Sequence, residues 1–150
     1  MTFTHRLILL KEMNRMNNEY EMSSHENYLK NRINEKIEEI QNMNIEMGAK
    51  QETLHDAIEK QDKHQLVLEQ KQITIKHQHE EQGIKPTQAK EKAKQETMEE
   101  QKTAIQYQNI VDMLKTDIDI LKRRQKLAYK ELDFLMLQYE ECMGGCKCSG

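Results

Sequence analysis

The sequence predicts an all-α protein built as an elongated coiled coil, and three observations lead to that prediction. Apolar residues make up 36% of the 150 residues, below the roughly 45–50% of globular chains, so a large compact core is not expected. The abundant residue types are glutamate, lysine, glutamine and methionine, which favour helices, while proline occurs once. In the last third of the chain, apolar residues recur every three or four positions, as on one stripe of a helix.

The clearest repeat is a heptad over residues 104–142. Its a positions start at Ala104 and its d positions at Tyr107, and eleven of these twelve positions are apolar or aromatic. Gln125, at an a position, is the exception. Because burying such a stripe requires another helix, this segment predicts a coiled coil.

A weaker heptad runs through the first coiled-coil helix, which we expect over residues 25–82. Its d positions start at Ile33 and are mostly apolar, whereas five of the seven a positions counted from Ile37 are polar. Polar a residues fix the register of a coiled coil at a cost in stability. The first helix therefore offers a narrow and weakly stabilising seam.

Gly83 and Pro86 lie between the two heptads. Glycine suits the left-handed position that closes a helix, and a proline shortly after it prevents the helix from continuing. We expect a turn over residues 83–87, followed by a second coiled-coil helix over residues 88–142. The chain would then form a long antiparallel helical hairpin; a kinked continuous helix is the alternative.

The expected hairpin also predicts a register. In an antiparallel pair, the a residues of one helix face the d residues of the other. A turn at this place sets Ile58 opposite Leu114, and it sets Asn44 opposite Ala128, a poorer layer. Because the seam of the first helix is weak, we expect the hairpin to pack into a larger helical bundle.

The second helix is apolar over more than its a and d positions. Met113, Ile120, Leu127 and Phe134 occupy successive c positions, and Ile110 a g position. Together with a and d they cover a sector of about 160° of the helix, which is too broad for one partner helix. We expect partner contacts, with other coiled-coil subunits or a second copy, at Tyr107, Ile110, Val111, Met113, Leu114, Ile118, Ile120, Leu121, Leu127, Leu132, Phe134 and Leu135.

The two ends of the chain differ from the helical middle. Residues 1–20 alternate apolar and basic positions and predict an amphipathic segment, whereas residues 143–150 predict a flexible tail of cysteine and glycine. Cys142, Cys146 and Cys148 could bind zinc or copper(I), but a closed zinc site needs a fourth ligand that the tail lacks. We expect reduced thiols without a metal, and a thiol-dependent or metal-dependent assembly switch is an alternative function.

No catalytic, nucleotide-binding or complete metal-binding motif occurs in the sequence. The predictions are therefore a non-enzymatic protein without cofactor, metal or small-molecule substrate. The one compact basic cluster consists of Lys122, Arg123, Arg124 and Lys126, and an adaptor that binds an acidic polymer, such as microtubule tails or nucleic acid, is a further alternative. The absence of interleaved aromatic residues speaks against nucleic acid.

These features together predict a structural scaffold or spacer that assembles through the apolar face of residues 104–142. The chain has no apolar run of bilayer length, and its net charge of −3 gives no bias towards anionic membranes. In composition it resembles the coiled-coil subunits of cilia, centrosomes and kinetochores, although it carries no family motif. We therefore expect a cytoplasmic location, in the cytoskeleton or a cilium, with microtubule or cytoskeletal association.

Overall fold

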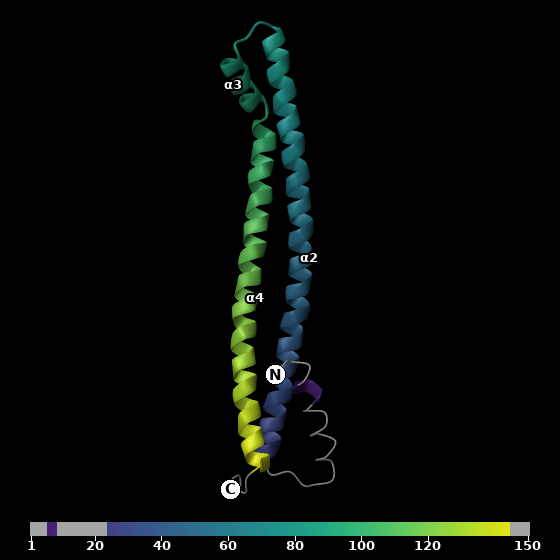
Figure 1. The fold of residues 1–150 in the computed structure, drawn as a ribbon, viewed down its shortest axis with the longest axis vertical. Coiled ribbons are helices and arrows are strands. Elements are labelled where there is room, and N and C mark those ends of the chain that lie inside the picture. Colours follow the sequence, from purple (N-terminus) through teal and green to yellow (C-terminus); the bar gives the residue numbers. More distant parts are fainter. Residues whose placement is uncertain (1–5, 9–23, 145–150) are drawn as a thin grey trace. The chain divides into compact units, whose positions relative to one another are not determined.

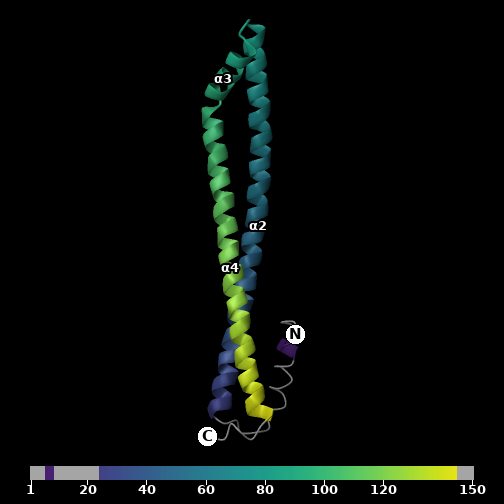
Figure 2. The same cartoon turned by 60° about the vertical axis from the view of Figure 1, so that its left-hand side comes forward.

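The structure, a computed structural model, describes residues 6–8 and 24–144. Every regular element in these ranges is helical, which confirms the all-α prediction: α2 spans Ser24–Glu81, α3 spans Pro86–Glu96 and α4 spans Met98–Gly144 (Figures 1 and 2). Of the expected amphipathic segment 1–20, residues 6–8 are described and helical; the rest lies outside the described residues. Of the expected tail 143–150, residues 143 and 144 belong to α4, and the rest lies outside the described residues.

The chain divides into two compact units, each containing part of α2 and part of α4. The first unit comprises residues 1–41 and 126–150, and the second comprises residues 42–125, including all of α3. Within each unit, α2 and α4 lie side by side in both views of the ribbon (Figures 1 and 2). Each unit therefore buries its apolar side chains between the same two helices.

The core of the first unit is formed by large aliphatic side chains of α2 and, on α4, by a and d residues together with Met136 at an e position. Leu29, Ile33, Ile40 and Leu132 are each almost completely buried. On α2, the buried residues lie on one stripe in which every third or fourth residue points inward, as in an amphipathic helix. The other buried apolar residues of this unit are Ile37, Ala128, Met136, Tyr139 and Cys142.

The second unit has a thinner core. Its central cluster contains Ala57, Val111 and Leu114, with Leu54 and Ile58 packed against it. Ile58 and Leu114, which the sequence sets opposite each other, thus belong to one cluster. Farther along α2, the polar a positions leave little to bury, and two of the buried residues on α3 are alanines, Ala89 and Ala93.

Polar pairs show the direction of the helices in the second unit: Lys50 pairs with Asp117 (3.3 Å), Gln61 with Gln108, and Lys71 with Glu100. Residue numbers rise along α2 while those of the partners fall along α4. The two helices are therefore antiparallel in this unit.

The end of α2 is closed by Gly83, which has a φ of 88°. The amide of Gly83 donates to the carbonyl of Glu80 (3.0 Å), and the amide of Ile84 donates to that of His79 (3.1 Å). These bonds satisfy carbonyls that have no partner within the helix, as glycine-closed helix ends do. Lys85 is extended, and Pro86 is the first residue of α3, where a missing amide hydrogen costs nothing.

The sequence predicts one helix over residues 88–142, but the structure has two, α3 and α4, separated at Thr97. Thr97 is completely buried and leaves the helical conformation, with φ −109° and ψ 22°. Its hydroxyl donates to the carbonyl of Ala93 (2.8 Å) and accepts a bond from the amide nitrogen of Gln72 (3.1 Å). Thr97 is therefore held by hydrogen bonds to its own preceding turn and to α2 at the point where α3 ends.

Replacing each of the two glycines of the second unit by alanine should change the free energy of unfolding in opposite directions. Gly83→Ala should lower the free energy of unfolding by about 1–2 kcal/mol, because an L-residue is strained at this φ. Nothing lies within 4 Å of the added methyl group, so no clash contributes. Gly48→Ala, inside α2 and equally open, should raise the free energy of unfolding by about 1 kcal/mol. Urea denaturation followed by circular dichroism measures both, and shifts of the same sign would contradict this description of the turn.

Candidate interaction surface on α4

Helix α4 has a covered face formed by its heptad. Every a and d position from Val111 to Cys142 is buried or half-buried. Gln125, the polar exception, is half-buried, and its amide nitrogen donates to the side-chain oxygen of Asn44 on α2. The register inferred from the sequence sets Asn44 opposite Ala128, but its observed partner is Gln125. Because the amides of Asn44 and Gln125 bond to each other, neither is left without a hydrogen-bond partner between apolar side chains.

The residues that the sequence assigns to partner contacts divide into two groups. Those that face the core of their own unit are Val111, Leu114, Ile118, Leu121 and Leu132, which are buried, and Tyr107 and Leu135, which are half-buried. Those that remain at the surface are Ile110, Met113, Ile120, Leu127 and Phe134. Only the second group is free to contact another protein without opening the α2–α4 pair.

In the second unit, the exposed apolar group contains Met113 and Ile120, seven residues apart, with 58% and 40% of their surface exposed. Ile110 lies one turn before Met113 and is 44% exposed. Ile105 is also exposed, at 62%. Ile105 is absent from the predicted contact residues, although an isoleucine at a b position, which is normally polar, is a signal that could have identified it.

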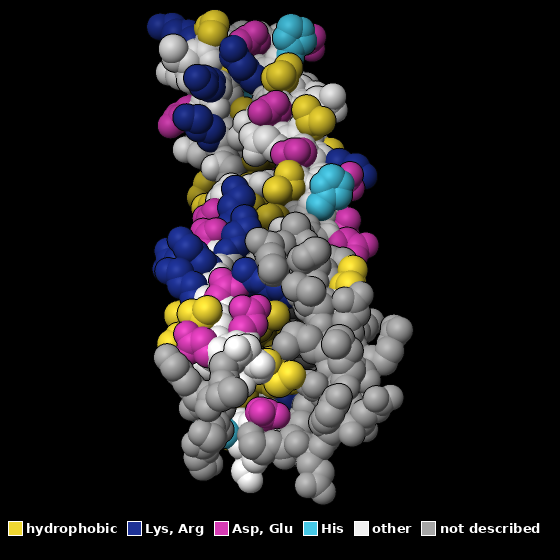
Figure 3. All heavy atoms as spheres, turned by 60° about the horizontal axis from the view of Figure 1, so that its bottom comes forward, with side chains coloured by type: hydrophobic (Ala, Val, Ile, Leu, Met, Phe, Trp, Pro, Cys, Tyr) yellow, Lys and Arg dark blue, Asp and Glu magenta, His cyan; other side chains and the backbone are white. Residues whose placement is uncertain are grey.

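In the first unit, Leu127 and Phe134 form the corresponding pair, also seven residues apart, with 58% and 61% of their surface exposed. Leu137 is exposed as well and was missed for the same reason, since it occupies an f position. Figure 3 shows hydrophobic side chains at the surface among lysines, arginines and acidic residues. In both units, therefore, α4 keeps apolar side chains in water at a heptad spacing.

A hollow of about 350 Å³ lies beside Phe134 in the first unit. Phe134 and Leu135 form its apolar side, and charged residues of both signs line the rest: Arg32, Lys36, Lys130 and Glu131. Such a hollow next to an exposed aromatic ring is a place where a side chain of a neighbouring helix could insert.

Among the described residues of the first unit, Lys36 is the most buried charged residue, and it joins α2 to α4. Its ammonium pairs with Glu131 on α4 and with Glu39 on α2, the latter at 2.9 Å. The hydrogen bond to Glu131, and then that to Glu39, raises the pKa of Lys36 above its usual value of 10.5. This lysine is held in its charged form and fixes the two helices beside the hollow.

The basic cluster is exposed. Lys122, Arg123 and Arg124 belong to the second unit and Lys126 to the first, and all four side chains are exposed. Among the described residues, none of the four has an ion-pair partner within 4 Å. Their charges are therefore not neutralised by the parts of the chain that the structure describes.

The structure also bears on the cysteines and on metal binding. Cys142 is buried and disulfide-bonded, so the expectation of three reduced thiols is wrong for this residue, while Cys146 and Cys148 lie outside the described residues. Within residues 6–8 and 24–144, no group of three or more histidine, cysteine, aspartate or glutamate side chains could hold a metal ion. In the same ranges, no helix combines the length and hydropathy required to cross a bilayer.

Comparison of the chain with protein-family models, with curated proteins and with solved structures finds no match. The interaction surface is therefore interpreted from its own geometry.

The ion pairs of Lys36 should make stability depend on alkaline pH. Because the folded-state pKa of Lys36 is raised, its contribution to stability is complete below the unfolded pKa of about 10.5 and is lost as pH rises through the folded pKa. Lys36→Met should therefore lose less stability than the wild type between about pH 10 and 12. The matched control is Lys102→Met, since Lys102 is exposed and pairs with Glu99 on the same helix. Equal losses in Lys36→Met and the wild type would contradict the assigned role of Lys36.

Proposed function

We propose that this protein is a non-enzymatic structural coiled coil, an antiparallel helical hairpin that acts as a scaffold or spacer in a multi-subunit assembly. The observation that carries the proposal is the second apolar face of α4. The heptad a and d residues are already covered within each unit, yet Met113, Ile120, Leu127 and Phe134 remain exposed at every seventh position. A repeat of this kind is typical of a helix that packs against more than one neighbour.

The hairpin part of the proposal is supported within each unit. In the second unit, the order of the polar pairs along α2 and α4 is antiparallel. In the first unit, Lys36 on α2 pairs with Glu131 on α4, between the stripes of buried apolar residues. The turn at Gly83 and Pro86 allows the chain to reverse between the two helices.

The assembly part follows from the free energy of burial. Fully burying a leucine or phenylalanine side chain contributes about 1.5–3 kcal/mol. Because Leu127 and Phe134 are 58% and 61% exposed, covering both supplies about 2–4 kcal/mol of association free energy, before the entropy lost on association is subtracted. A third helix, from a second copy or from another coiled-coil subunit, would cover this face and convert the hairpin into a bundle.

The remaining parts of the proposal rest on the sequence. The assignment as a non-enzymatic protein rests on the lack of a catalytic motif, and the cytoplasmic setting in a cytoskeletal or ciliary assembly rests on composition. The proposal that α4 carries an association surface depends on neither of these two assignments.

Substitution of the exposed face should abolish assembly without unfolding the chain. Leu127→Ser/Phe134→Ser, and separately Met113→Ser/Ile120→Ser, should weaken association by at least about tenfold, since each tenfold corresponds to about 1.4 kcal/mol. Sedimentation equilibrium across a concentration series measures the association constant, and circular dichroism checks that helicity is retained. Leu121→Asp would be less informative, because Leu121 is buried within the second unit.

The matched control is Tyr28→Ser/Ile45→Ser, which removes two apolar side chains of α2 that are 58% and 72% exposed. This variant should associate as the wild type does. Equal association constants for the wild type, the control and both α4 variants would contradict the proposal. If the wild type is monomeric, the same variants are compared for capture of a partner from cell extract, where only the α4 variants should lose it.

A second candidate function is the binding of an acidic polymer, favoured by the exposed and unneutralised Lys122, Arg123 and Arg124. If this is correct, Lys122→Glu/Arg123→Glu/Arg124→Glu should lose cosedimentation with microtubules while its oligomeric mass is unchanged. The expected loss is at least about tenfold in affinity, because three attractive charges become repulsive. Unchanged cosedimentation would exclude this function.

A further inference from the structure

The exposed apolar pair of the first unit, Leu127 and Phe134, is flanked by two residues of opposite charge. Lys130 and Glu131 lie between them on α4, at an f and a g position, and therefore on the two sides of the line that joins the exposed c residues. Both charged side chains are exposed, and with Phe134 they line the hollow of the first unit. A partner on Leu127 and Phe134 would therefore meet a positive charge on one flank and a negative charge on the other.

Both charges remain available to a partner. Lys130 has no ion-pair partner among the described residues. Glu131 pairs with Lys36 through its Oε2 atom, yet 48% of the Glu131 side-chain surface stays exposed. A cation from another chain can therefore approach Glu131 without breaking its contact with α2.

The order of the two charges favours one orientation of a second copy of the chain. A second copy related by a two-fold axis presents the same residues to the first. In a parallel pair of helices, the flank with f positions of one helix meets the flank with g positions of the other, as the e and g positions of a parallel coiled coil do. Lys130 of each copy then lies opposite Glu131 of the other, once on each flank of the contact.

An antiparallel pair would bring equal charges together. In that orientation each flank meets the same flank of the second copy, so with Leu127 over Phe134, Lys130 would lie beside Lys130 and Glu131 beside Glu131. Like charges placed against each other oppose a contact. The parallel pair, which sets Leu127 on Leu127 and Phe134 on Phe134, is therefore the one in which the apolar contact and the charges agree.

The exposed apolar pair of the second unit has no such flanks. Met113 and Ile120 are flanked by Thr116 and Asp117, of which only Asp117 is charged. Asp117 also pairs with Lys50 on α2, at 3.3 Å. Charge therefore does not select a second copy at this pair.

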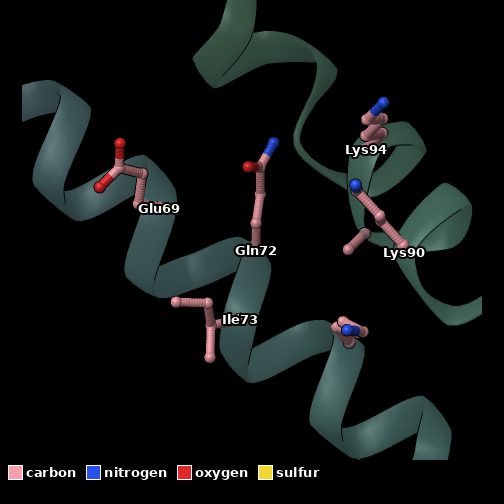
Figure 4. A pocket seen from close by; sticks show the side chains of 7 residues that line it. Glu69, Gln72, Ile73, Lys90 and Lys94 are labelled. Atoms are coloured by element: carbon pink, nitrogen blue, oxygen red, sulfur yellow. The ribbon is translucent and has the colours of Figure 1, made fainter. Parts of the chain in front are cut away.

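The groove of about 340 Å³ between α2 and α3, also in the second unit, lacks the apolar pair itself. Figure 4 shows Glu69, Gln72 and Ile73 projecting from α2, with Lys90 and Lys94 on α3. Of the described residues that line it, Ile73 is the one large apolar residue. The combination of two apolar residues at heptad spacing with self-complementary charges thus belongs to the first unit.

We propose that the first unit pairs with the first unit of a second copy of this chain, in parallel and in register, through Leu127 and Phe134. Lys130 of each copy pairs with Glu131 of the other and fixes the orientation. This inference rests on the proposed association through α4, and it names the partner at one of the two exposed apolar pairs.

The test measures the dissociation constant of the full chain by sedimentation equilibrium, with circular dichroism as a check on helicity. Lys130→Glu places like charges on both flanks and should raise the dissociation constant by about fivefold or more. Glu131→Lys should do the same. An equimolar mixture of the two variants should associate as the wild type does, because each flank then again joins an acidic to a basic side chain.

Glu131→Lys also removes the partner of Lys36 within the chain. If this variant loses helicity, Glu131→Gln takes its place. Its mixture with Lys130→Glu should still associate more tightly than Lys130→Glu alone, because one flank of the mixed pair keeps a lysine opposite a glutamate.

The matched control is Lys126→Glu, the same reversal of charge in the same unit at an exposed b position, away from the apolar pair. It should leave the dissociation constant within about twofold, since exposed charges far from a contact are screened. Arg123→Glu should not weaken association either, because Arg123 takes the f position one heptad before Lys130 and would lie near Arg124 of the second copy.

Equal weakening by Lys130→Glu and either control would overturn the parallel pairing, as would a mixture that associates no more tightly than Lys130→Glu alone. In both cases a loss of association in Leu127→Ser/Phe134→Ser would still support the surface on α4. A wild type that stays monomeric but captures another protein through α4 would overturn pairing with a second copy and leave the proposed function standing.

Discussion

The packing of α4 against α2 depends on side chains that recur every three or four residues, and one helix can cover only one such stripe of its neighbour. In α4 this stripe runs from Val111 to Cys142 and is covered within each unit. The apolar residues outside the stripe, such as Met113 and Phe134, have no room against α2. Both the stability of each unit and the surface left for partners therefore follow from how the apolar residues of α4 are distributed around its axis.

The polar residues of α2 complement this arrangement. Asn44 and Gln125 form a polar layer in the second unit, which costs stability but selects one register, since a shift would leave both amides unpaired. Farther along, Gln72 bonds to the hydroxyl of Thr97 at the point where α3 gives way to α4. The thin core there leaves α3 as a separate helix, and its lysines form one wall of a groove.

The sequence was sufficient for the helical class, because helix formation depends on local patterns. Glycine at positive φ and proline in the first turn are recognisable without knowledge of the partner helix. The break at Thr97 was not predictable, because other threonines of α2 and α4 bond to the preceding turn in the same way without interrupting their helix. The register was misplaced at Asn44 because it was set by an assumed loop length, whereas the chain pairs two amides. Leu137 was not predicted to be a contact residue, because it occupies an f position, outside the heptad positions at which apolar residues recur.

The central claim is that the exposed face of α4 becomes covered when the protein assembles. The most direct measurement replaces phenylalanine by 4-fluorophenylalanine in a Phe3→Leu background, which leaves Phe134 as the only labelled residue. The fluorine resonance is recorded in light and heavy water across the concentrations at which the chain associates, since its solvent isotope shift reports exposure. The account predicts that this shift disappears as association proceeds. A fluorine at Phe134 that stays exposed to solvent in the associated protein would contradict it.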